Sequence, residues 1–229
     1  MASELPQCAN CNVESEERIC RNPDGVGPGE CPTVEMEDVV ARATSHYDDP
    51  SVHEFARQAS IQEAEGYGNR DLKPYVKHPI KPRLEEIIDF SRKMGYQRLG
   101  IAFCAGLHAE ADLLDSVLTG AGFETVSVVC KVGCTPKETI GLEDHEKMRI
   151  GEFESMCSPI AQAEVLNESD TDFNILLGLC VGHDSLFFRY SEAPVTVFAA
   201  KDRVMGHNPI AALYTLGSYS ERFAPPDLE

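Results

Sequence analysis

Short apolar segments alternate with amphipathic stretches through the second half of the chain, and this alternation constrains the fold more than any other feature of the sequence. Each apolar segment is long enough for a buried strand, and the stretches between them contain the apolar spacing of helices. The pattern predicts an α/β fold with an open, mainly parallel sheet covered by helices. We expect strands at 99–103, 124–129, 173–179 and 195–199, and helices at 109–119, 159–167 and 209–216.

Three of the four predicted strands are followed directly by a cysteine, namely Cys104, Cys130 and Cys180. Because the carboxyl ends of parallel strands line one crevice, we expect these three thiols to converge at one edge of the sheet. Cys157, which precedes the helix before the third strand, and Cys134 are candidates for a fourth group. The alternative is that each of these cysteines is simply a small buried hydrophobic residue.

The loops after the predicted strands also carry polar side chains suited to proton transfer or to stabilising a thiolate. The candidates for catalytic roles are His183, Glu110 and Lys131, of which Lys131 would favour an anionic thiolate centre. For His183 three interpretations stay open: a metal ligand, a proton donor, or a loop residue that caps the next helix together with Asp184. The polar run at 201–209 follows the fourth strand and is either part of the site or a solvated loop.

The first 32 residues contain too few apolar side chains to become ordered by burial alone. The two-residue spacing of Cys8 and Cys11 lets both sulfurs reach one tetrahedral ion or one edge of a cluster, and Cys20 and Cys31 complete a four-thiolate set. The gaps match neither a common zinc ribbon nor a ferredoxin run. A thioredoxin-like motif is disfavoured because no predicted strand precedes the first pair. We therefore expect a metal to hold this segment.

The sequence predicts three regions along the chain. They are a cysteine-rich metal-binding segment at 1–35, a helical linker region at 36–96, and an α/β domain with a cysteine-lined crevice at 97–229. Two short helices are expected within 34–64, followed by an irregular stretch at 66–79. A third helix should begin at Pro82, because proline is favoured in the first turn of a helix, and end near Gly95.

The charge balance excludes some classes of partner. The 229 residues include 20 Lys and Arg against 38 Asp and Glu, which gives a formal net charge of −18. Nucleic acids and anionic membranes favour basic surfaces, so we expect neither as a partner. The amino terminus lacks a secretory pattern and no apolar run approaches the ~20 residues that cross a bilayer, which predicts a cytoplasmic protein. Nine cysteines in a reducing compartment are typical of metal ligands or catalytic thiols.

Five motifs cover much of the chain. They are Phe103-Cys104-Ala-Gly-Leu, Cys130-Lys131, Cys157-Ser-Pro-Ile-Ala-Gln162-Ala, Gly178-Leu-Cys180-Val-Gly-His183-Asp184-Ser185-Leu-Phe and Lys201-Asp-Arg-Val-Met-Gly-His207-Asn208-Pro209. Together with the cysteine-rich amino terminus, they resemble a family of uncharacterised proteins labelled as metal-binding, which occurs largely in anaerobic bacteria and archaea. The resemblance implies metal binding but no particular reaction. Ser158 stands where that family has Asn, and Cys134 lies outside its pattern, which favours Cys157 as the fourth group.

Sulfur ligands exclude magnesium and calcium and leave zinc or iron–sulfur as the main choices. The anaerobic setting that the resemblance implies favours an iron–sulfur cluster, of the 4Fe-4S type, at the sheet edge, with zinc as the alternative at the amino-terminal site. The cluster at the sheet edge has four candidate ligands, of which we expect three to bind iron. They are Cys104, Cys130, Cys157 and Cys180.

The expected function is a redox or desulfidase-like reaction on a small molecule, in which His183 or Glu110 would move protons. Two alternatives stay open. One is a non-catalytic electron-transfer or metal-handling subunit that docks to a redox partner protein. The other is a zinc-stabilised sulfur carrier that works through its thiols.

Overall fold

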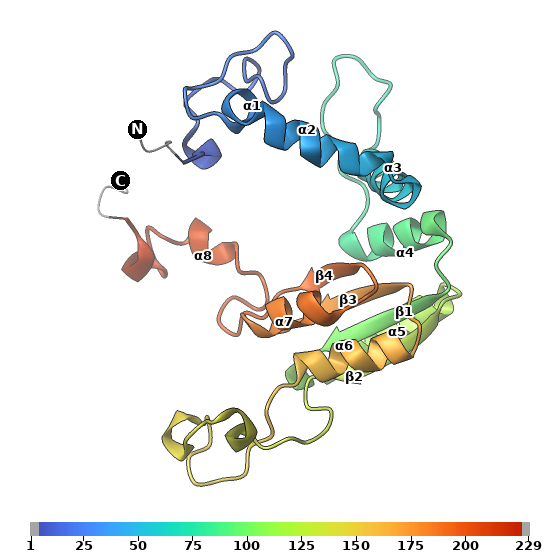
Figure 1. The fold of residues 1–229 in the computed structure, drawn as a ribbon, viewed down its shortest axis with the longest axis vertical. Coiled ribbons are helices and arrows are strands. Elements are labelled where there is room, and N and C mark those ends of the chain that lie inside the picture. Colours follow the sequence, from blue (N-terminus) through green and yellow to red (C-terminus); the bar gives the residue numbers. More distant parts are fainter. Residues whose placement is uncertain (1–4, 226–229) are drawn as a thin grey trace. The chain divides into compact units, whose positions relative to one another are not determined.

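The computed structural model describes residues 5–225, and the chain forms two compact units, Met1–Glu65 and Gly66–Glu229 (Figure 1). The first unit contains the amino-terminal cysteines and the helices that follow them. The second contains all four strands and the remaining cysteines. None of the helices within 5–225 combines the length and the apolar composition needed to span a membrane.

The first unit consists of a loop-rich segment followed by helices. In the loop-rich segment a single 3₁₀ turn, η1, covers Cys8–Asn10. Asp49 ends the helical stretch before α3, and its carboxylate accepts N–H groups of Ser51 and Val52 in the first turn of α3. Within the described part of this unit, Gln62 alone is buried, so the unit has almost no apolar core. The helical elements are α1 (Pro32–Glu35), α2 (Glu37–Ser45), η2 (His46–Asp48) and α3 (Pro50–Glu65).

The second unit is built on a four-stranded parallel sheet with the strand order β2-β1-β3-β4. The strands are β1 (Arg98–Phe103), β2 (Glu124–Val129), β3 (Phe173–Leu177) and β4 (Val195–Ala199). The two central strands, β1 and β3, are almost completely buried, whereas β2 and β4 are partly exposed as edge strands. These observations confirm the predicted α/β class and the parallel sheet.

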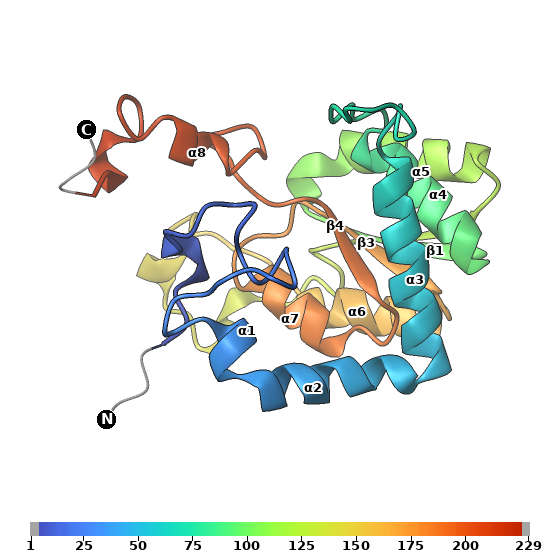
Figure 2. The same ribbon diagram turned by 90° about the horizontal axis from the view of Figure 1, so that it is seen from above.

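Helices cover both faces of the sheet. Right-handed crossovers place α5 on one face and α6 and α7 on the other, because the chain moves in opposite directions across the sheet after β1 and after β2. Figure 2 shows this arrangement, with α4 on the same side as α5. The helices are α4 (Arg83–Met94), α5 (His108–Gly120), α6 (Pro159–Glu168) and α7 (His183–Tyr190).

The strand order creates a topological switch point between β1 and β3. The chain leaves β1 toward β2 on one side and later returns to place β3 on the other side of β1. At such a point the loops at the carboxyl ends of the two central strands diverge and leave a crevice, where parallel α/β sheets bind their ligands.

Two predictions about the third strand need correction. The third strand ends at Leu177 and not at residue 179, because Gly178 turns the chain at a φ of +69° and packs so closely on Leu107 that no Cβ would fit. Cys180 therefore lies three residues beyond the strand instead of directly after it.

The last predicted helix, at 209–216, is shorter in the structure, where α8 covers only Ala211–Tyr214. Ile210 is its N-cap residue, and no side chain caps it. The loop before α8 is instead ordered by Asp202, whose carboxylate accepts the N–H groups of Val204 and Met205.

Candidate functional site

The carboxyl edge of the sheet contains a pocket of about 380 Å³, which we call the thiol pocket. The backbone hydrogen bonds of the sheet continue into the cysteines: the Cys104 N–H donates to the Leu177 carbonyl (3.1 Å) and the Cys130 N–H donates to the Phe103 carbonyl (2.8 Å). The sheet thus fixes the cysteine backbone on neighbouring segments. The cysteines that line the pocket are Cys104, Cys130, Cys157 and Cys180.

Cys130 lies at the centre of this group and is only 3% exposed, whereas the other three cysteines of the pocket are partly exposed. Its Sγ lies 3.8 Å from the Sγ of Cys157 and accepts the Ala105 N–H at 3.3 Å. It is also hydrogen-bonded to Cys104. Cys130 therefore contacts thiols from two other chain segments.

These contacts shift the thiol pKa values in opposite directions. The hydrogen bond between Cys104 and Cys130 is the largest cause that lowers the pKa of Cys104 to about 5. The hydrogen bond between Cys157 and Cys130 is likewise the largest cause that lowers the pKa of Cys157 to about 5. The pKa of Cys130 is raised by the same two hydrogen bonds and by burial. The arrangement favours a protonated central thiol beside thiolates.

Cys157 has a cation beside it. The Lys131 ammonium group lowers the pKa of Cys157 through its charge and a hydrogen bond, and it is held in place because it donates to the Ser155 carbonyl at 2.6 Å. His183 also contributes a favourable charge at Cys157. The structure therefore brings two of the three predicted catalytic residues close to one thiol.

Two further cations lie at the pocket, and both belong to the polar run at 201–209, for which the sequence left a place in the site or in a solvated loop open. The Lys201 ammonium group interacts with the Cys104 thiolate and lowers its pKa, and the Arg203 guanidinium donates to the Cys180 Sγ at 3.2 Å. Both residues follow β4, at the same edge of the sheet as the cysteines. The structure therefore places these two residues of the run at the site.

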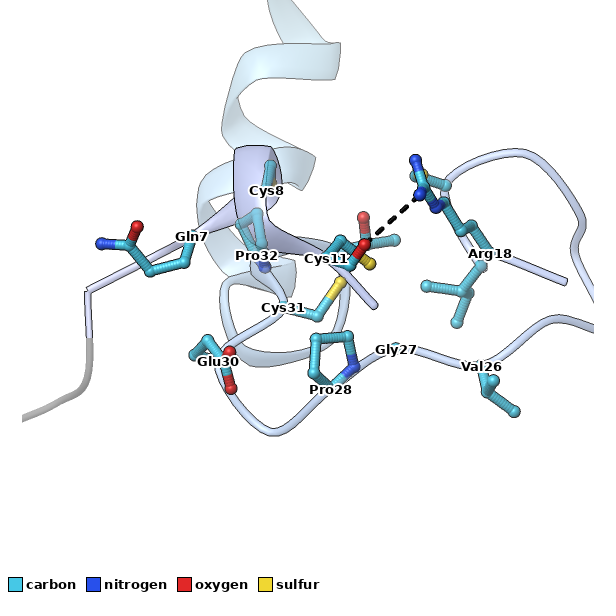
Figure 3. A pocket seen from close by; sticks show the side chains of 13 residues that line it. Gln7, Cys8, Cys11, Arg18, Val26, Gly27, Pro28, Glu30, Cys31 and Pro32 are labelled. Atoms are coloured by element: carbon cyan, nitrogen blue, oxygen red, sulfur yellow. Dashed lines mark hydrogen bonds between the residues drawn. The ribbon is translucent and has the colours of Figure 1, made fainter. Parts of the chain in front are cut away.

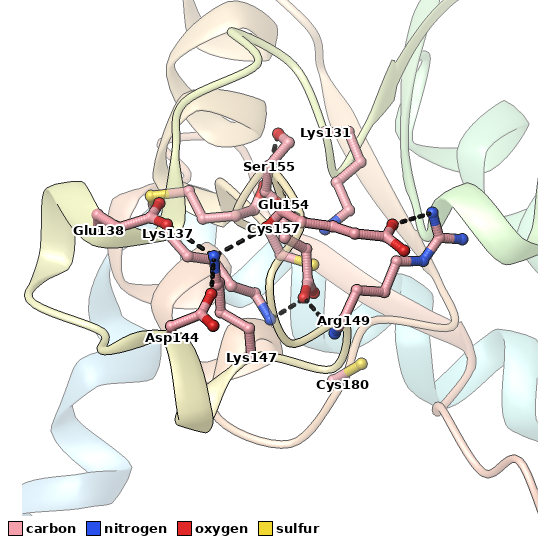
Figure 4. A network of polar contacts seen from close by, with 12 residues as sticks. Lys131, Lys137, Glu138, Asp144, Lys147, Arg149, Glu154, Ser155, Cys157 and Cys180 are labelled. Carbon is pink, nitrogen blue, oxygen red and sulfur yellow. Dashed lines mark hydrogen bonds and ion pairs between the residues drawn. The ribbon is translucent and has the colours of Figure 1, made fainter.

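The long loop 131–157 forms one wall of the thiol pocket and contributes Arg149 and Phe153 to its lining. The loop is ordered by Lys147, whose side chain is 5% exposed (Figure 4). The Lys147 ammonium group contacts three oxygens: Asp144 Oδ1 at 2.7 Å, Glu138 Oε1 at 2.9 Å and the Glu152 carbonyl at 2.8 Å. This buried cation explains how a polar loop without strands or long helices keeps its shape.

A second, mostly apolar pocket of about 570 Å³ lies between α6 and α7, and we call it the α6–α7 groove. Its lining includes Ile160, Val165 and Leu186, together with His183. Cys157 lines both this groove and the thiol pocket. A small molecule in the groove would therefore reach the thiols at Cys157.

Two other predicted candidates lie apart from the thiol pocket. Glu110 is exposed in the first turn of α5 and does not line the pocket. Cys134 is exposed, adopts a φ of +49° and lines neither the thiol pocket nor the α6–α7 groove.

The four amino-terminal cysteines line a pocket of about 170 Å³ in the first unit (Figure 3). Figure 3 shows the side chains of Cys11 and Cys31 directed toward one another. Gly27 packs directly against Cys31: a Cβ on Gly27 would lie 2.9 Å from the Cys31 Sγ. Cys8 and Cys20 are the other two cysteines that line this pocket.

Backbone hydrogen bonds shape the loops around the amino-terminal pocket. Arg18 donates from its side chain to the carbonyls of Val13 (2.8 Å) and Cys11 (3.3 Å). A bridge between Arg18 and Val26 brings the two halves of the segment together. These contacts are polar and local, which agrees with the near absence of buried residues in this unit.

The donor set of the two cysteine groups fits a thiophilic metal centre. In residues 5–225, no three Cys, His, Asp or Glu side chains are gathered closely enough to hold one metal ion. The ligands of a cluster bind different iron atoms, so a cluster does not require all of its sulfurs to surround one ion. In the amino-terminal pocket, the thiols would need to rotate toward a shared ion.

The fold and the site define a parallel α/β protein with a thiol-lined pocket at the carboxyl edge of its sheet. Residues 31–198 match the family described as "Protein of unknown function (DUF1847)", and the chain belongs to this family. It is 46% identical over 164 residues to "Uncharacterized protein MJ0455" of Methanocaldococcus jannaschii, which covers 72% of this chain and 81% of the archaeal protein. These matches confirm the resemblance to an uncharacterised family. No solved structure matches the chain.

Proposed function

We propose that the protein is an iron–sulfur protein that acts on a small molecule at the thiol pocket and holds a second metal, iron or zinc, at its amino-terminal cysteines. The observation that carries this proposal is the convergence of four cysteines, from separate chain segments, on one pocket at the switch point of the sheet. When bound, a cluster of this kind supplies a redox centre or a Lewis-acidic iron.

The surroundings of the thiols support an anionic centre. Thiolate ligands and their cluster carry negative charge, which is costly in a partly buried pocket without compensation. Lys131, Lys201 and Arg203 supply that compensation at Cys157, Cys104 and Cys180. The Ala105 N–H adds a hydrogen bond to sulfur, which is a common way to tune such centres.

The reaction that we propose is the removal of sulfur from a small organic thiol, or a related redox reaction. In an eliminating desulfuration the C–S bond breaks, sulfur leaves as hydrogen sulfide, and the neighbouring carbon loses a proton. His183 is placed to accept or return this proton, because it lines the α6–α7 groove beside Cys157. Lys131 would help the anionic sulfur to approach.

The test is the metal content of Cys180→Ser beside that of Cys134→Ser, both isolated without oxygen. We expect Cys180→Ser to lose the colour and iron of the thiol pocket and to keep the amino-terminal metal. Cys134→Ser, the matched control, should keep both, since Cys134 lines neither pocket at the sheet edge. If Cys180→Ser keeps the full iron content of a folded, iron-containing protein, the proposed site is wrong.

The same preparations separate the proposal from its two alternatives. A cluster whose iron atoms are all bound by protein thiolates would favour an electron-transfer subunit, because no position would be open for a substrate. A colourless protein that contains zinc alone would favour a sulfur carrier that works through free thiols. Hydrogen sulfide release from small organic thiols would support the enzyme.

A further inference from the structure

We propose that the substrate of the thiol pocket is a small organic thiol with an apolar tail, and that this tail lies in the α6–α7 groove while the sulfur reaches the cysteines at Cys157. This inference rests on the proposed function, whose substrate it defines more closely. It gives the α6–α7 groove the role of selecting among small thiols.

The first observation is that exposed apolar side chains gather at this groove. The buried side chains of α6 pack in the core, yet Ile160 and Val165 of the same helix are exposed. Leu186 from α7 and Ile140 from the loop 131–157 are exposed as well, and all four line one hollow. Single exposed apolar residues are common, but a group of them around a hollow is typical of a binding site.

The groove is a fixed feature of the fold. Because α6 and α7 precede the parallel strands β3 and β4, both helices begin at the carboxyl edge of the sheet and run side by side away from it. Phe187 of α7 belongs to the same core cluster as Leu166 of α6. At the far end, the Asn167 side chain donates to the Tyr190 carbonyl at 2.9 Å and accepts the Glu192 N–H at 3.0 Å. These contacts hold the two walls of the groove in place.

The groove has a polar end, and this end lies at the thiols. Cys157 and Ser158 immediately precede α6, and His183 is the first residue of α7, so all three lie where the helices begin. The apolar lining continues along α6 from Pro159 to Val165, which corresponds to about 9 Å of helix. A ligand that matches this polarity has its sulfur at Cys157 and its tail along the helices.

The size of the groove favours a small molecule over a protein partner. Its volume of about 570 Å³ lies within the range of about 300–1,000 Å³ that is typical of small-molecule sites. A stable protein interface involves about 20–30 residues on each side, whereas 11 residues line this groove. Glu164, an exposed carboxylate in the lining, disfavours an anionic tail by charge repulsion. The tail that fits is therefore neutral and apolar.

The experiment measures the binding of straight-chain thiols to the full-length protein isolated without oxygen. The probes are propanethiol, butanethiol and pentanethiol, each with its sulfur on the terminal carbon, and ligand-observed NMR titrations give their dissociation constants. Each methylene that enters an apolar groove strengthens binding by about fourfold, so affinity should rise along the series. Equal affinity for all three thiols would overturn the proposal.

Two substitutions and a matched control locate the tail. Val165→Asp places a charge in the groove and should weaken pentanethiol binding by about tenfold and remove the dependence on tail length. Leu186→Asn repeats the test from α7, so that a folding defect in one variant does not decide the result. The control is Val117→Asp on α5, because Val117 is 42% exposed against 39% for Val165 and lines none of the three pockets. It should bind the series as the unsubstituted protein does.

Pentanol separates the groove from the thiols, because it has the same tail and no sulfur. We expect pentanethiol to bind more tightly than pentanol. Cys180→Ser should remove this preference and keep the dependence on tail length, since Cys180 lines the thiol pocket and not the groove. Equal binding of pentanol and pentanethiol by the unsubstituted protein would overturn a thiol as the substrate.

Failure of the groove and failure of the proposed function give different results. A protein without iron that still binds longer tails more tightly, with the loss confined to the groove variants, overturns the proposed function and supports the groove as the seat of the tail. An iron-containing protein whose affinities fall equally in Val165→Asp and Val117→Asp overturns the role of the groove alone. If Val165→Asp converts a dimer into a monomer and tail length has no effect, the groove is an interface between two copies of the chain, and the proposal is wrong.

Discussion

The two groups of cysteines in this chain are organised in opposite ways. At the sheet edge, parallel strands and a buried core place the thiols before any ligand is considered, and backbone hydrogen bonds fix the cysteines directly. In the amino-terminal segment, local polar contacts and one 3₁₀ turn shape the loops, and almost nothing is buried. The first group is therefore a site that the fold builds, and the second is a segment that a metal would have to hold.

This difference has a thermodynamic consequence. Where a site is preformed, the free energy of metal binding is available for affinity or for chemistry. Where it is not, metal binding contributes to folding, as in small metal-stabilised domains. We therefore expect loss of metal to loosen the first unit and to leave the second folded.

The largest expected effect is that of Cys11→Ser. This substitution should remove the amino-terminal metal and make the first thirty or so residues sensitive to limited proteolysis, because little else orders them. The iron of the thiol pocket should stay. Metal analysis and mass spectrometry of the fragments measure both effects. Equal protease resistance before and after substitution would show that the metal does not hold this segment.

The second effect concerns Gly27, whose place against Cys31 leaves no room for a side chain. Gly27→Ala would press a methyl group onto the Cys31 sulfur, and overpacking of about 1–3 kcal/mol corresponds to roughly tenfold to hundredfold weaker metal binding. Gly29→Ala is the matched control, since no atom lies within 4 Å of its added Cβ. A competition titration with a coloured chelator compares the two. Equal affinities would contradict the packing argument.

The third effect concerns Gln162, whose side chain supports the preformed site at the sheet edge. Gln162 is completely buried on α6 and donates its side-chain amide to the carbonyls of Phe103 (3.2 Å) and Val128 (2.7 Å), which lie at the ends of β1 and β2. Gln162→Leu should cost about 1–3 kcal/mol of unfolding free energy, because buried carbonyls lose a donor. Urea unfolding measures this cost, with the exposed Glu164→Gln on the same helix as control. If Gln162→Leu loses no more unfolding free energy than the control does, the side-chain hydrogen bonds of Gln162 do not stabilise the preformed site.

The smallest effect is a shift in the pH dependence of thiol reactivity in metal-free protein. Alkylation of Cys157 should increase as the pH rises through about 5, because the lowered pKa makes it a thiolate above that pH. In unfolded protein the midpoint should move to about 8.5. This thiolate therefore stabilises the folded state above the unfolded pKa, and the contribution is lost as the pH falls through about 5.

Lys131→Gln is the variant that tests the cause of this shift. Removing the ammonium group should raise the midpoint at Cys157 by a smaller amount than unfolding does, because the hydrogen bond between Cys157 and Cys130 is the larger cause. An unchanged midpoint would show that the Lys131 charge does not act on this thiol.

The fold could be predicted from the sequence because each strand is a distinct apolar segment. The predicted ranges of β2 and β4 agree with the structure, and β1 differs only by including Arg98. The end of β3 was wrong because its apolar run continues through Leu179, while the turn is set by the packing of Gly178 on Leu107. Apolar periodicity does not report such a contact.

The convergence of the strand-end cysteines followed from the parallel sheet, but the order among them did not. That Cys130 is buried between Cys104 and Cys157 depends on contacts between segments far apart in the chain. Lys147, which orders the loop beside the pocket, is also indistinguishable in sequence from an exposed lysine. Its role depends on carboxylates that the loop brings together.

The most direct test of the central claim is elemental analysis combined with electron paramagnetic resonance on protein isolated without oxygen. We predict iron and acid-labile sulfide in matching amounts, a cluster signal after reduction, and loss of that signal in Cys180→Ser but not in Cys11→Ser. A colourless protein that contains zinc alone, with no sulfide and no signal, would contradict it.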